Sequence, residues 1–310
     1  MAMIEVRDLH KQLGSKKVLN GVSFGVGEGE VFGYLGPNGA GKTTTMRCLL
    51  GLLKPTSGSA LVWGEDLGTR NDLRARIGVL LESDGLYERL SAQANLDYFA
   101  RLYGVSNRAE RVRLLLDFAG LSRDKDRKVG QFSRGMKRKL ALARALIHQP
   151  GVLFMDEPTA GLDPEAQKMV RDLVLQLSRD EHITVFLNSH DLDEVARVCS
   201  RVAILKEGEV RASDTMENLR SKYGTPVVRI GLPGQEEAGR VARLLEPLDY
   251  VTASQNAGSD LRVKVDDPAR SSQLLSFLVE KGVTVSEVTR EGNSLEDVYL
   301  KIVTGEAVDA

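Results

Sequence analysis

The chain has 310 residues, 42% of them hydrophobic and 27% charged, and its formal net charge is −1. This length allows two domains with sizeable cores, and the near-neutral charge gives no basic field that would favour nucleic-acid binding. The two cysteines, Cys48 and Cys199, lack metal-site spacing, which suits a reducing cytosol. The N-terminus lacks the apolar core of a signal peptide, and no uncharged apolar run is long enough to span a bilayer. If the protein serves a membrane, we expect it to do so from the water side, through another chain.

The first two thirds of the chain combine β patterns with helical ones. The β patterns lie at residues 3–9, 21–26, 30–36, 54–67, 151–158, 183–190 and 201–214. The strand that ends at Gly36 runs directly into a glycine-rich turn and an apolar helix. A charged helical pattern occupies about residues 84–150. Strands that alternate with helices in this way predict an α/β fold with a mostly parallel sheet.

A domain boundary is predicted near residues 221–228, where Gly224 and Pro226 interrupt the pattern. The segment beyond it reads strand, helix, strand, strand, helix, strand and a last helix. This is the βαββαβ order of a small α+β, ferredoxin-like domain. The expected parts of the chain are residues 1–220, a helical insert at about 84–150, and residues 225–310.

A phosphate loop is predicted by GPNGAGKT, because a strand precedes it and a helix follows it. Its glycines let the backbone curl until several N–H groups point inward. Lys42 would reach the β- and γ-phosphates of a nucleotide, and the Thr43 hydroxyl would ligate Mg²⁺. The alternative is a glycine-rich turn that only caps a helix. The candidate binding residues are Gly36, Pro37, Asn38, Gly39, Ala40, Gly41, Lys42, Thr43 and Thr44.

Two carboxylates end the apolar strand VLFMDEP. Buried strands seldom end in Asp-Glu unless a cation or a chemical task requires it. Asp156 would hold Mg²⁺, directly or through water, and Glu157 would polarise an attacking water. Taken alone, the pair would more simply cap the next helix. Beside a phosphate loop, it favours a catalytic site.

A second helix start with the chemistry of an anion site lies far downstream, in QFSRGMKRKLALARAL. Ser133 and Gly135 would present a hydroxyl and accessible backbone N–H groups at the positive end of the helix dipole. The alternative is an ordinary N-cap serine. We expect Lys137, Arg138 and Lys139 to form a mostly solvated face of this helix.

With these motifs in this order, about residues 3–220 resemble the ATP-binding cassette (ABC) ATPases, the nucleotide-binding subunits of ABC transporters. FSRGM stands where this family has its signature sequence, and LLESDGLY stands at its Q-loop. AGLDP holds the D-loop with Asp163, and NSHDLDEV holds the switch histidine, His190. The resemblance implies a P-loop core with a mixed sheet and a helical insert, which binds ATP with Mg²⁺ and hydrolyses the ATP.

The resemblance also implies a reason for two phosphate-facing helix starts. Members of the family pair head to tail, and each ATP lies between the phosphate loop of one copy and the signature helix of the other. Ser133 and Gly135 would therefore contact the γ-phosphate of the ATP bound by a second copy, in a site that Asp163 also borders. His190 would hydrogen-bond the γ-phosphate and help Glu157 to orient the water.

Three features depart from the family pattern. The Q-loop position holds Glu82 where the family has Gln, and its carboxylate remains a candidate Mg²⁺ ligand. Arg134 and Met136 replace Gly and Gln in the signature sequence. Leu13 stands where the family usually stacks an aromatic residue on adenine. We therefore expect weak recognition of the base, through apolar contact from Leu13 or Val18.

The βαββαβ segment and its ending, SLEDVYLKIV, look like the C-terminal domain of drug-resistance and sodium-efflux type ATPases of the ABC-2 exporter group. This resemblance implies a peripheral subunit at the cytoplasmic face of the membrane, bound to a separate ABC-2 type permease. We expect a docking groove along SDGLYERLSAQANL, where Leu86, Tyr87 and Leu90 would receive a short permease helix. The alternative is that these side chains belong to the core of the insert.

Two other functions stay open. One is a soluble ABC ATPase that acts on ribosomes or DNA. Such chains typically carry two cassettes or a long coiled-coil insertion, whereas this chain has one phosphate loop, no sustained heptads and no basic excess. We therefore expect no nucleic-acid partner. The other is a ligand-sensing role of the C-terminal domain, which is compatible with export.

Overall fold

The computed structural model describes residues 2–81, 83–224, 227–267, 269–291 and 294–304. The chain divides into two compact units, Met1–Met216 and Glu217–Ala310. None of the helices in the described ranges is both long enough and apolar enough to cross a bilayer.

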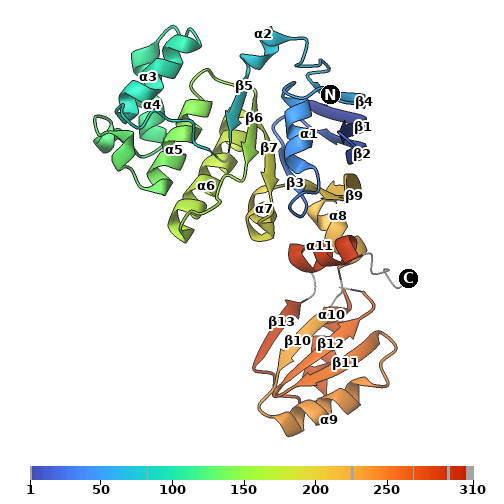
Figure 1. The fold of residues 1–310 in the computed structure, drawn as a ribbon. Coiled ribbons are helices and arrows are strands. Elements are labelled where there is room, and N and C mark those ends of the chain that lie inside the picture. Colours follow the sequence, from blue (N-terminus) through green and yellow to red (C-terminus); the bar gives the residue numbers. More distant parts are fainter. Residues whose placement is uncertain (1, 82, 225–226, 268, 292–293, 305–310) are drawn as a thin grey trace. The chain divides into compact units, whose positions relative to one another are not determined.

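The first unit is built on a six-stranded sheet with the order β5-β6-β7-β3-β8-β9 (Figure 1). Its strands are β5 (Ile77–Leu80), β6 (Val152–Asp156), β7 (Thr184–Ser189), β3 (Val31–Leu35), β8 (Arg201–Lys206) and β9 (Glu209–Thr215). All neighbouring pairs are parallel except β8 and β9, so the predicted mixed sheet is confirmed. The parallel strands are short apolar runs, as expected for a sheet covered on both faces. Their carboxyl ends lie at one edge, where α/β proteins bind ligands.

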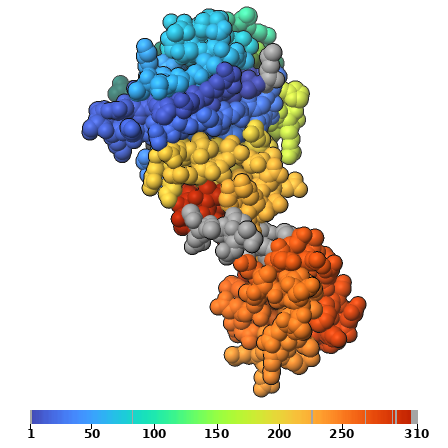
Figure 2. All heavy atoms as spheres, turned by 90° about the vertical axis from the view of Figure 1, so that its right-hand side faces the viewer, coloured from blue at the N-terminus to red at the C-terminus, as the bar shows by residue number. Residues whose placement is uncertain are grey.

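A separate three-stranded antiparallel sheet has the order β2-β1-β4. Its strands are β1 (Ile4–Leu13), β2 (Lys16–Val26) and β4 (Ser57–Val62). In Figure 2 the blue N-terminal residues of the unit lie beside yellow residues from its C-terminal part, and β2 contacts β9. The sequence predicted most of these strands, but it did not reveal that they form a second sheet. Alternation identifies a half-exposed strand without identifying its partner.

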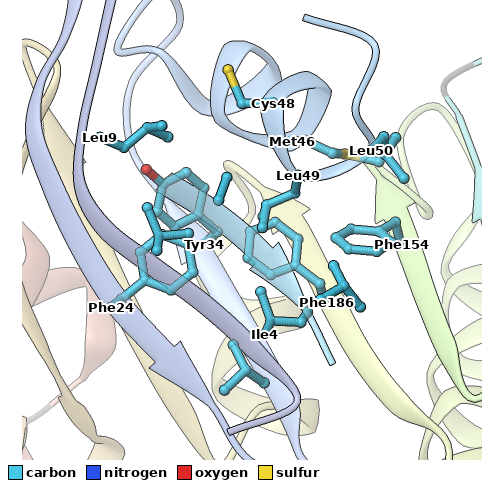
Figure 3. Packing of buried hydrophobic residues seen from close by; sticks show 14 of the residues in the cluster. Ile4, Leu9, Phe24, Tyr34, Met46, Cys48, Leu49, Leu50, Phe154 and Phe186 are labelled. Atoms are coloured by element: carbon cyan, nitrogen blue, oxygen red, sulfur yellow. The ribbon is translucent and has the colours of Figure 1, made fainter. Parts of the chain in front are cut away.

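The core of the first unit lies between these sheets and helix α1 (Lys42–Leu49) (Figure 3). Aromatic rings fill it: the ring centroids of Phe24 and Tyr34 are 5.1 Å apart, and those of Tyr34 and Phe186 are 5.4 Å apart. The Tyr34 hydroxyl lies 3.1 Å from the Thr45 hydroxyl, and burial raises the pKa of Tyr34. This contact fixes α1, and with it the loop that leads into it, against the sheet.

The predicted helical insert contains α3 (Ala92–Leu102), α4 (Arg108–Phe118) and α5 (Arg134–Ala145), which contact one another. Ser91 caps α3 and Ser133 caps α5, each by accepting a hydrogen bond from a backbone N–H in the first turn. The remaining helices of the first unit are α2 (Asn71–Arg74), α6 (Pro164–Glu181) and α7 (Leu192–Val198). Asp163 and Asp191 cap α6 and α7 in the same way.

The second unit has the predicted βαββαβ order. Its elements are β10 (Val227–Gly231), α9 (Gln235–Leu245), β11 (Val251–Ala257), β12 (Asp260–Val265), α10 (Arg270–Glu280), β13 (Glu287–Glu291) and α11 (Leu295–Thr304). The strands pair antiparallel in the order β11-β12-β10-β13, which is a ferredoxin-like sheet. Apolar residues of β10, β12, α9 and α10 form its core. Helix α8 (Met216–Tyr223) lies at the start of this unit, before β10, where the sequence had indicated no helix.

The two units should lose stability independently, because the buried clusters described for them have no residue in common. We predict that Leu274→Ala, at a fully buried position of α10, destabilises the second unit by about 2–5 kcal/mol. Hydrogen exchange should then accelerate in β10–β13 and stay unchanged in β3, β6 and β7. Val279→Ala is the matched control, since Val279 lies on the same helix and is 71% exposed. Equal acceleration in both units would contradict independent cores.

Candidate active site

A surface cavity of about 560 Å³ lies at the carboxyl ends of β3, β6 and β7. It is lined by Lys16, Val18, Asn38, Gly39, Gly41, Lys42, Thr43, Thr44, Asp156, Glu157, Ala160, Asn188 and His190. These residues come from segments that are far apart in the sequence. The parallel sheet brings them together because β7 pairs with both β3 and β6.

The loop between β3 and α1 is held close to neighbouring strands. A Cβ atom on Gly36 would lie 2.4 Å from the Leu205 carbonyl oxygen of β8. Gly41 has φ +112°, and a Cβ there would lie 2.6 Å from Leu19 Cδ2. Both positions therefore require glycine. Gly41 also occupies the N-cap of α1 and provides no side-chain cap. The first N–H groups of α1 thus remain available to an anion in the cavity.

Lys42 is a nearly buried cation, with 7% of its surface exposed. Its Nζ donates hydrogen bonds to the carbonyl oxygens of Gly36, at 2.6 Å, and Pro37, at 3.3 Å. Burial lowers the pKa of Lys42, whereas the nearby carboxylates of Glu157 and Asp156 raise it. The site therefore combines a desolvated ammonium group with two carboxylates across one cavity, a charge arrangement suited to a phosphate with its cation.

The two carboxylates at the end of β6 have different hydrogen-bond partners. Asp156 accepts a hydrogen bond from Asn188 Nδ2 of β7. Glu157 follows the strand in a left-handed backbone conformation, with φ +49°. His190 Nδ1 lies 2.8 Å from Glu157 Oε1, and the His190 backbone N–H also faces the Glu157 carboxylate. A left-handed non-glycine residue is uncommon, and such residues concentrate at functional sites.

Most of the predicted phosphate-loop residues lie around this cavity. Gly36 and Pro37 belong to the same loop, and their carbonyl oxygens accept hydrogen bonds from Lys42. Ala40, also in this loop, is buried. Val18 of β2 lines the cavity, but Leu13 does not; it ends β1 and is 48% exposed. Glu82 lies outside the described residues.

The second predicted phosphate contact does not belong to this cavity. Ser133 and Gly135 are not among its lining residues. Ser133 Oγ accepts a hydrogen bond from Met136 N at 3.2 Å and thereby caps α5. Asp163 also lies outside the cavity and caps α6, where its Oδ1 accepts a hydrogen bond from Ala166 N at 2.9 Å.

The expectation that Arg138 is solvated is wrong. Arg138 is 5% exposed, because it lies one helical turn before the buried Leu142 on the face of α5 that turns inward. Lys137 and Lys139 are half-buried, and Lys137 Nζ forms an ion pair with Glu88. These three consecutive basic residues therefore do not form one solvated face of α5.

Three site residues were not predicted from the sequence: Lys16, Ala160 and Asn188. Asn188 carried a usable signal, since it ends an apolar strand directly before Ser189 and His190. Its Oδ1 is a buried oxygen without a hydrogen-bond partner among the described residues. Lys16 carried no comparable signal, because lysines in a turn are ordinary surface residues.

A second cavity, of about 390 Å³, adjoins the first. It is lined by Asp84, Arg134, Arg138, Glu157, Ala160, Gly161 and Leu162. Glu157 and Ala160 line both cavities. The start of α5 thus borders a cavity that the catalytic carboxylate candidate also lines.

Comparison with protein families agrees with this arrangement. The family model described as "ABC transporter" matches residues 19–160. The model described as "ATP-binding protein DrrA1-3-like, C-terminal domain" matches residues 215–303. Each unit of the structure therefore has a family counterpart.

Two relatives match the chain over nearly its whole length. The bacitracin transport ATP-binding protein BcrA of Bacillus licheniformis is 35% identical over 304 residues, covering 98% of this chain and 98% of the relative. The Nod factor export ATP-binding protein I of Rhizobium sp. (strain N33) is 38% identical over 304 residues, covering 96% of each chain.

Solved structures match about 70% of this chain. An ATP-binding subunit of an ABC transporter is 32% identical, with a TM-score of 0.64, and the match covers 70% of this chain and 92% of that one. A dimeric ATP-binding cassette in a post-hydrolysis state, bound to ADP and Pi, is 27% identical, with a TM-score of 0.62 and coverage of 69% and 98%.

The phosphate loop and the carboxylate pair at one edge of the sheet define a P-loop nucleotide-binding protein. The relatives and the two family models make the assignment specific: the chain belongs to the ABC transporter ATPases and carries the C-terminal domain of the ABC-2 exporter type. The family resemblance found in the motifs is therefore confirmed.

Base recognition gives a prediction for Leu13, which remains a candidate contact to adenine. We predict that Leu13→Tyr tightens ATP binding by up to about 1–3 kcal/mol, because a ring would stack on the base. Gln12→Tyr is the matched control, because successive side chains of a strand point to opposite faces. Equilibrium titration with ATP and GTP measures both variants. If the unmodified protein already rejects GTP strongly, another residue recognises the base.

Proposed function

We propose that this chain is the ATP-hydrolysing subunit of an ABC exporter and that it drives transport by a separate membrane permease. The observation that carries this proposal is one cavity that joins the phosphate loop to the Glu157–His190 pair. The first group binds the phosphates of ATP, and the second acts on the water that cleaves the terminal phosphate.

Phosphate binding falls to the loop of residues 36–44. The open N–H groups at the start of α1 and the ammonium of Lys42 donate to the β- and γ-phosphates. Lys42 exchanges its carbonyl partners for phosphate oxygens, which are stronger acceptors for a charged donor. This exchange favours the triphosphate over an uncharged ligand.

The residues present also fit Mg²⁺. Thr43 and Asp156 line the same cavity, and both offer the oxygen donors that this cation prefers. Asn188 holds the Asp156 carboxylate, and its own buried Oδ1 has no hydrogen-bond partner in the part of the chain that the structure describes. Bound there, the cation would neutralise charge between the β- and γ-phosphates. Glu82 remains a further candidate ligand from the sequence.

The catalytic work on water is assigned to Glu157 and His190. Glu157 accepts a proton from the attacking water at a carboxylate oxygen, and this increases the nucleophilicity of the water. His190, within hydrogen-bond distance of Glu157 Oε1, orients that carboxylate, and its ring would also contact the γ-phosphate. Glu157 also has a left-handed backbone conformation, and strained conformations of this kind concentrate at functional sites, which supports its catalytic role.

A second copy of the chain completes each site in this proposal. Ser133, Gly135 and Asp163 lie outside the cavity of their own chain, although α5 begins like an anion site. A dimeric cassette is among the similar structures. Head-to-tail pairing would give Ser133 and Gly135 a ligand, namely the γ-phosphate of the ATP bound by the other copy, and Asp163 would border that site.

Export is proposed from the names of the full-length relatives, which describe bacitracin transport and Nod factor export. Those names favour transport over the alternative of a soluble ABC ATPase acting on ribosomes or DNA, and no nucleic-acid partner is proposed. The partner would be a membrane-embedded ABC-2 type permease, which holds this chain at the cytoplasmic face of the membrane.

The permease would dock on the helical insert. Tyr87 and Leu90 are 46% and 37% exposed, which supports a docking surface over insert core for these two side chains. Tyr87 packs edge-to-face on Tyr98, a residue that is 44% exposed, so an aromatic patch extends along α3. A short apolar permease helix is the proposed occupant.

We predict that Glu157→Gln keeps ATP affinity within about threefold and lowers turnover by at least about a hundredfold, since the general base is lost while the phosphate loop remains. Equilibrium binding and steady-state hydrolysis measure the two effects separately. Glu181→Gln, an exposed carboxylate at the end of α6, is the control and should hydrolyse ATP normally. Near-normal hydrolysis by Glu157→Gln would remove Glu157 from the catalytic role.

A further inference from the structure

Arg138, on α5, is hydrogen-bonded to the backbone of the catalytic loop. Its Nε donates to the Pro158 carbonyl oxygen at 2.7 Å, and its Nη2 donates to the carbonyl oxygens of Glu157, at 2.8 Å, and Asp156, at 3.2 Å. Three consecutive carbonyl groups are thus held by one planar guanidinium. The side chain is 5% exposed, so water does not compete effectively for these bonds.

The opposite edge of the same guanidinium holds a second segment. Arg138 Nη1 donates to the Leu81 carbonyl oxygen at 2.5 Å and lies 3.2 Å from Asp84 Oδ1. Leu81 directly follows β5, and Asp84 lies on the path from β5 to α3. One side chain therefore connects the entry to the helical insert with the end of β6.

The Glu157 backbone is restrained from both sides. Its N–H donates to the Asn188 carbonyl oxygen of β7 at 2.8 Å, and its carbonyl oxygen accepts from Arg138. Its left-handed conformation is unfavourable for a residue with a side chain and persists only where surrounding contacts impose it. Without Arg138, three adjoining carbonyl groups would lose a charged donor at the point where this conformation must be maintained.

The chemistry of arginine suits this position. Burial lowers the pKa of the Arg138 guanidinium, while the carboxylates of Asp84, Glu194 and Asp156 counteract this effect. A guanidinium offers five N–H donors in one plane, whereas lysine offers a single point charge that cannot span the same acceptors. Arg138 is not among the residues lining the phosphate-loop cavity, so its effect would be transmitted through Glu157.

We infer that Arg138 is a positioning residue: by holding the carbonyl groups of residues 156–158 against Leu81 and Asp84, it sets the orientation of the Glu157 carboxylate toward the attacking water. This inference rests on the proposed catalytic role of Glu157. It assigns to the signature helix a task within its own chain, separate from the proposed contact with the ATP of a second copy.

The test compares Arg138→Gln and Arg138→Lys in the full chain assembled with its permease. We expect Arg138→Gln to lower kcat at least tenfold while KM and the equilibrium Kd for ATP change less than threefold. Arg138→Lys should recover only part of kcat, because it restores the charge but not the planar set of donors. If both variants hydrolyse ATP at the unmodified rate, the inference is overturned.

Arg144→Gln is the matched control, because Arg144 is a half-buried arginine on the same helix as the buried Arg138 and also donates to a backbone carbonyl, that of Val79, at 3.0 Å. It should lower the thermal unfolding midpoint with kcat unchanged. If the Arg138 variants lose no more kcat than Arg144→Gln at the same loss of thermal stability, Arg138 has only a structural role. If Arg138→Gln does not fold, Arg138→Lys and Asp84→Asn replace it in the test. We expect each of these variants to lose kcat without losing thermal stability. An unchanged kcat in both would overturn the inference.

A double-variant cycle separates this inference from the proposed function. In Glu157→Gln, single-turnover cleavage of bound ATP should be unaffected, within twofold, by adding Arg138→Gln, because both changes remove the same contribution. If the double variant instead shows the product of the two single-variant losses in cleavage rate, Arg138 acts independently of Glu157 and the inference is overturned. Normal turnover in Glu157→Gln alone would instead overturn the proposed function, whatever the Arg138 variants do.

Discussion

One cavity brings a buried ammonium group, that of Lys42, close to two carboxylates, those of Asp156 and Glu157. The interaction between these charges is the constraint on which the proposed function of the first unit depends. A desolvated cation is unfavourable unless oxygen atoms surround it. Carbonyl groups of its own loop meet part of that requirement, and the neighbouring carboxylates meet another part. A triphosphate with its cation would satisfy all these groups together, which supports the ligand proposed for this site.

The sheet brings these groups to one edge, and packing fixes their directions. Tyr34 anchors α1 through Thr45, and Gly36 and Gly41 allow the loop to approach β8 and β2. On the other side, Arg138 binds the backbone around Glu157. The phosphate loop and the proposed catalytic carboxylate are therefore held by separate sets of contacts, so we expect substitutions to alter the binding of ATP and its cleavage separately.

The sequence predicted those features that depend on residues close together in the chain. The phosphate loop, the Asp156–Glu157 pair and the βαββαβ order are local patterns with fixed spacing, and the fold and family they implied are confirmed. The separate β2-β1-β4 sheet, the short strand β5 and the burial of Arg138 depend on distant partners, which local patterns do not reveal. The proposed contacts of Ser133 and Gly135 need a second chain and stay predictions.

The central claim is that each nucleotide site is completed by the α5 start of another copy. Cross-linking tests it most directly, with Asn38→Cys in one tagged copy and Arg134→Cys in the other, both without Cys48 and Cys199 and both carrying Glu157→Gln. In the complex assembled with the permease, we expect a short bifunctional thiol reagent to join the two tags when ATP is present and far less without nucleotide, because phosphate charge attracts both helix starts. A yield of linked tags that is no higher with ATP than without nucleotide would contradict the claim.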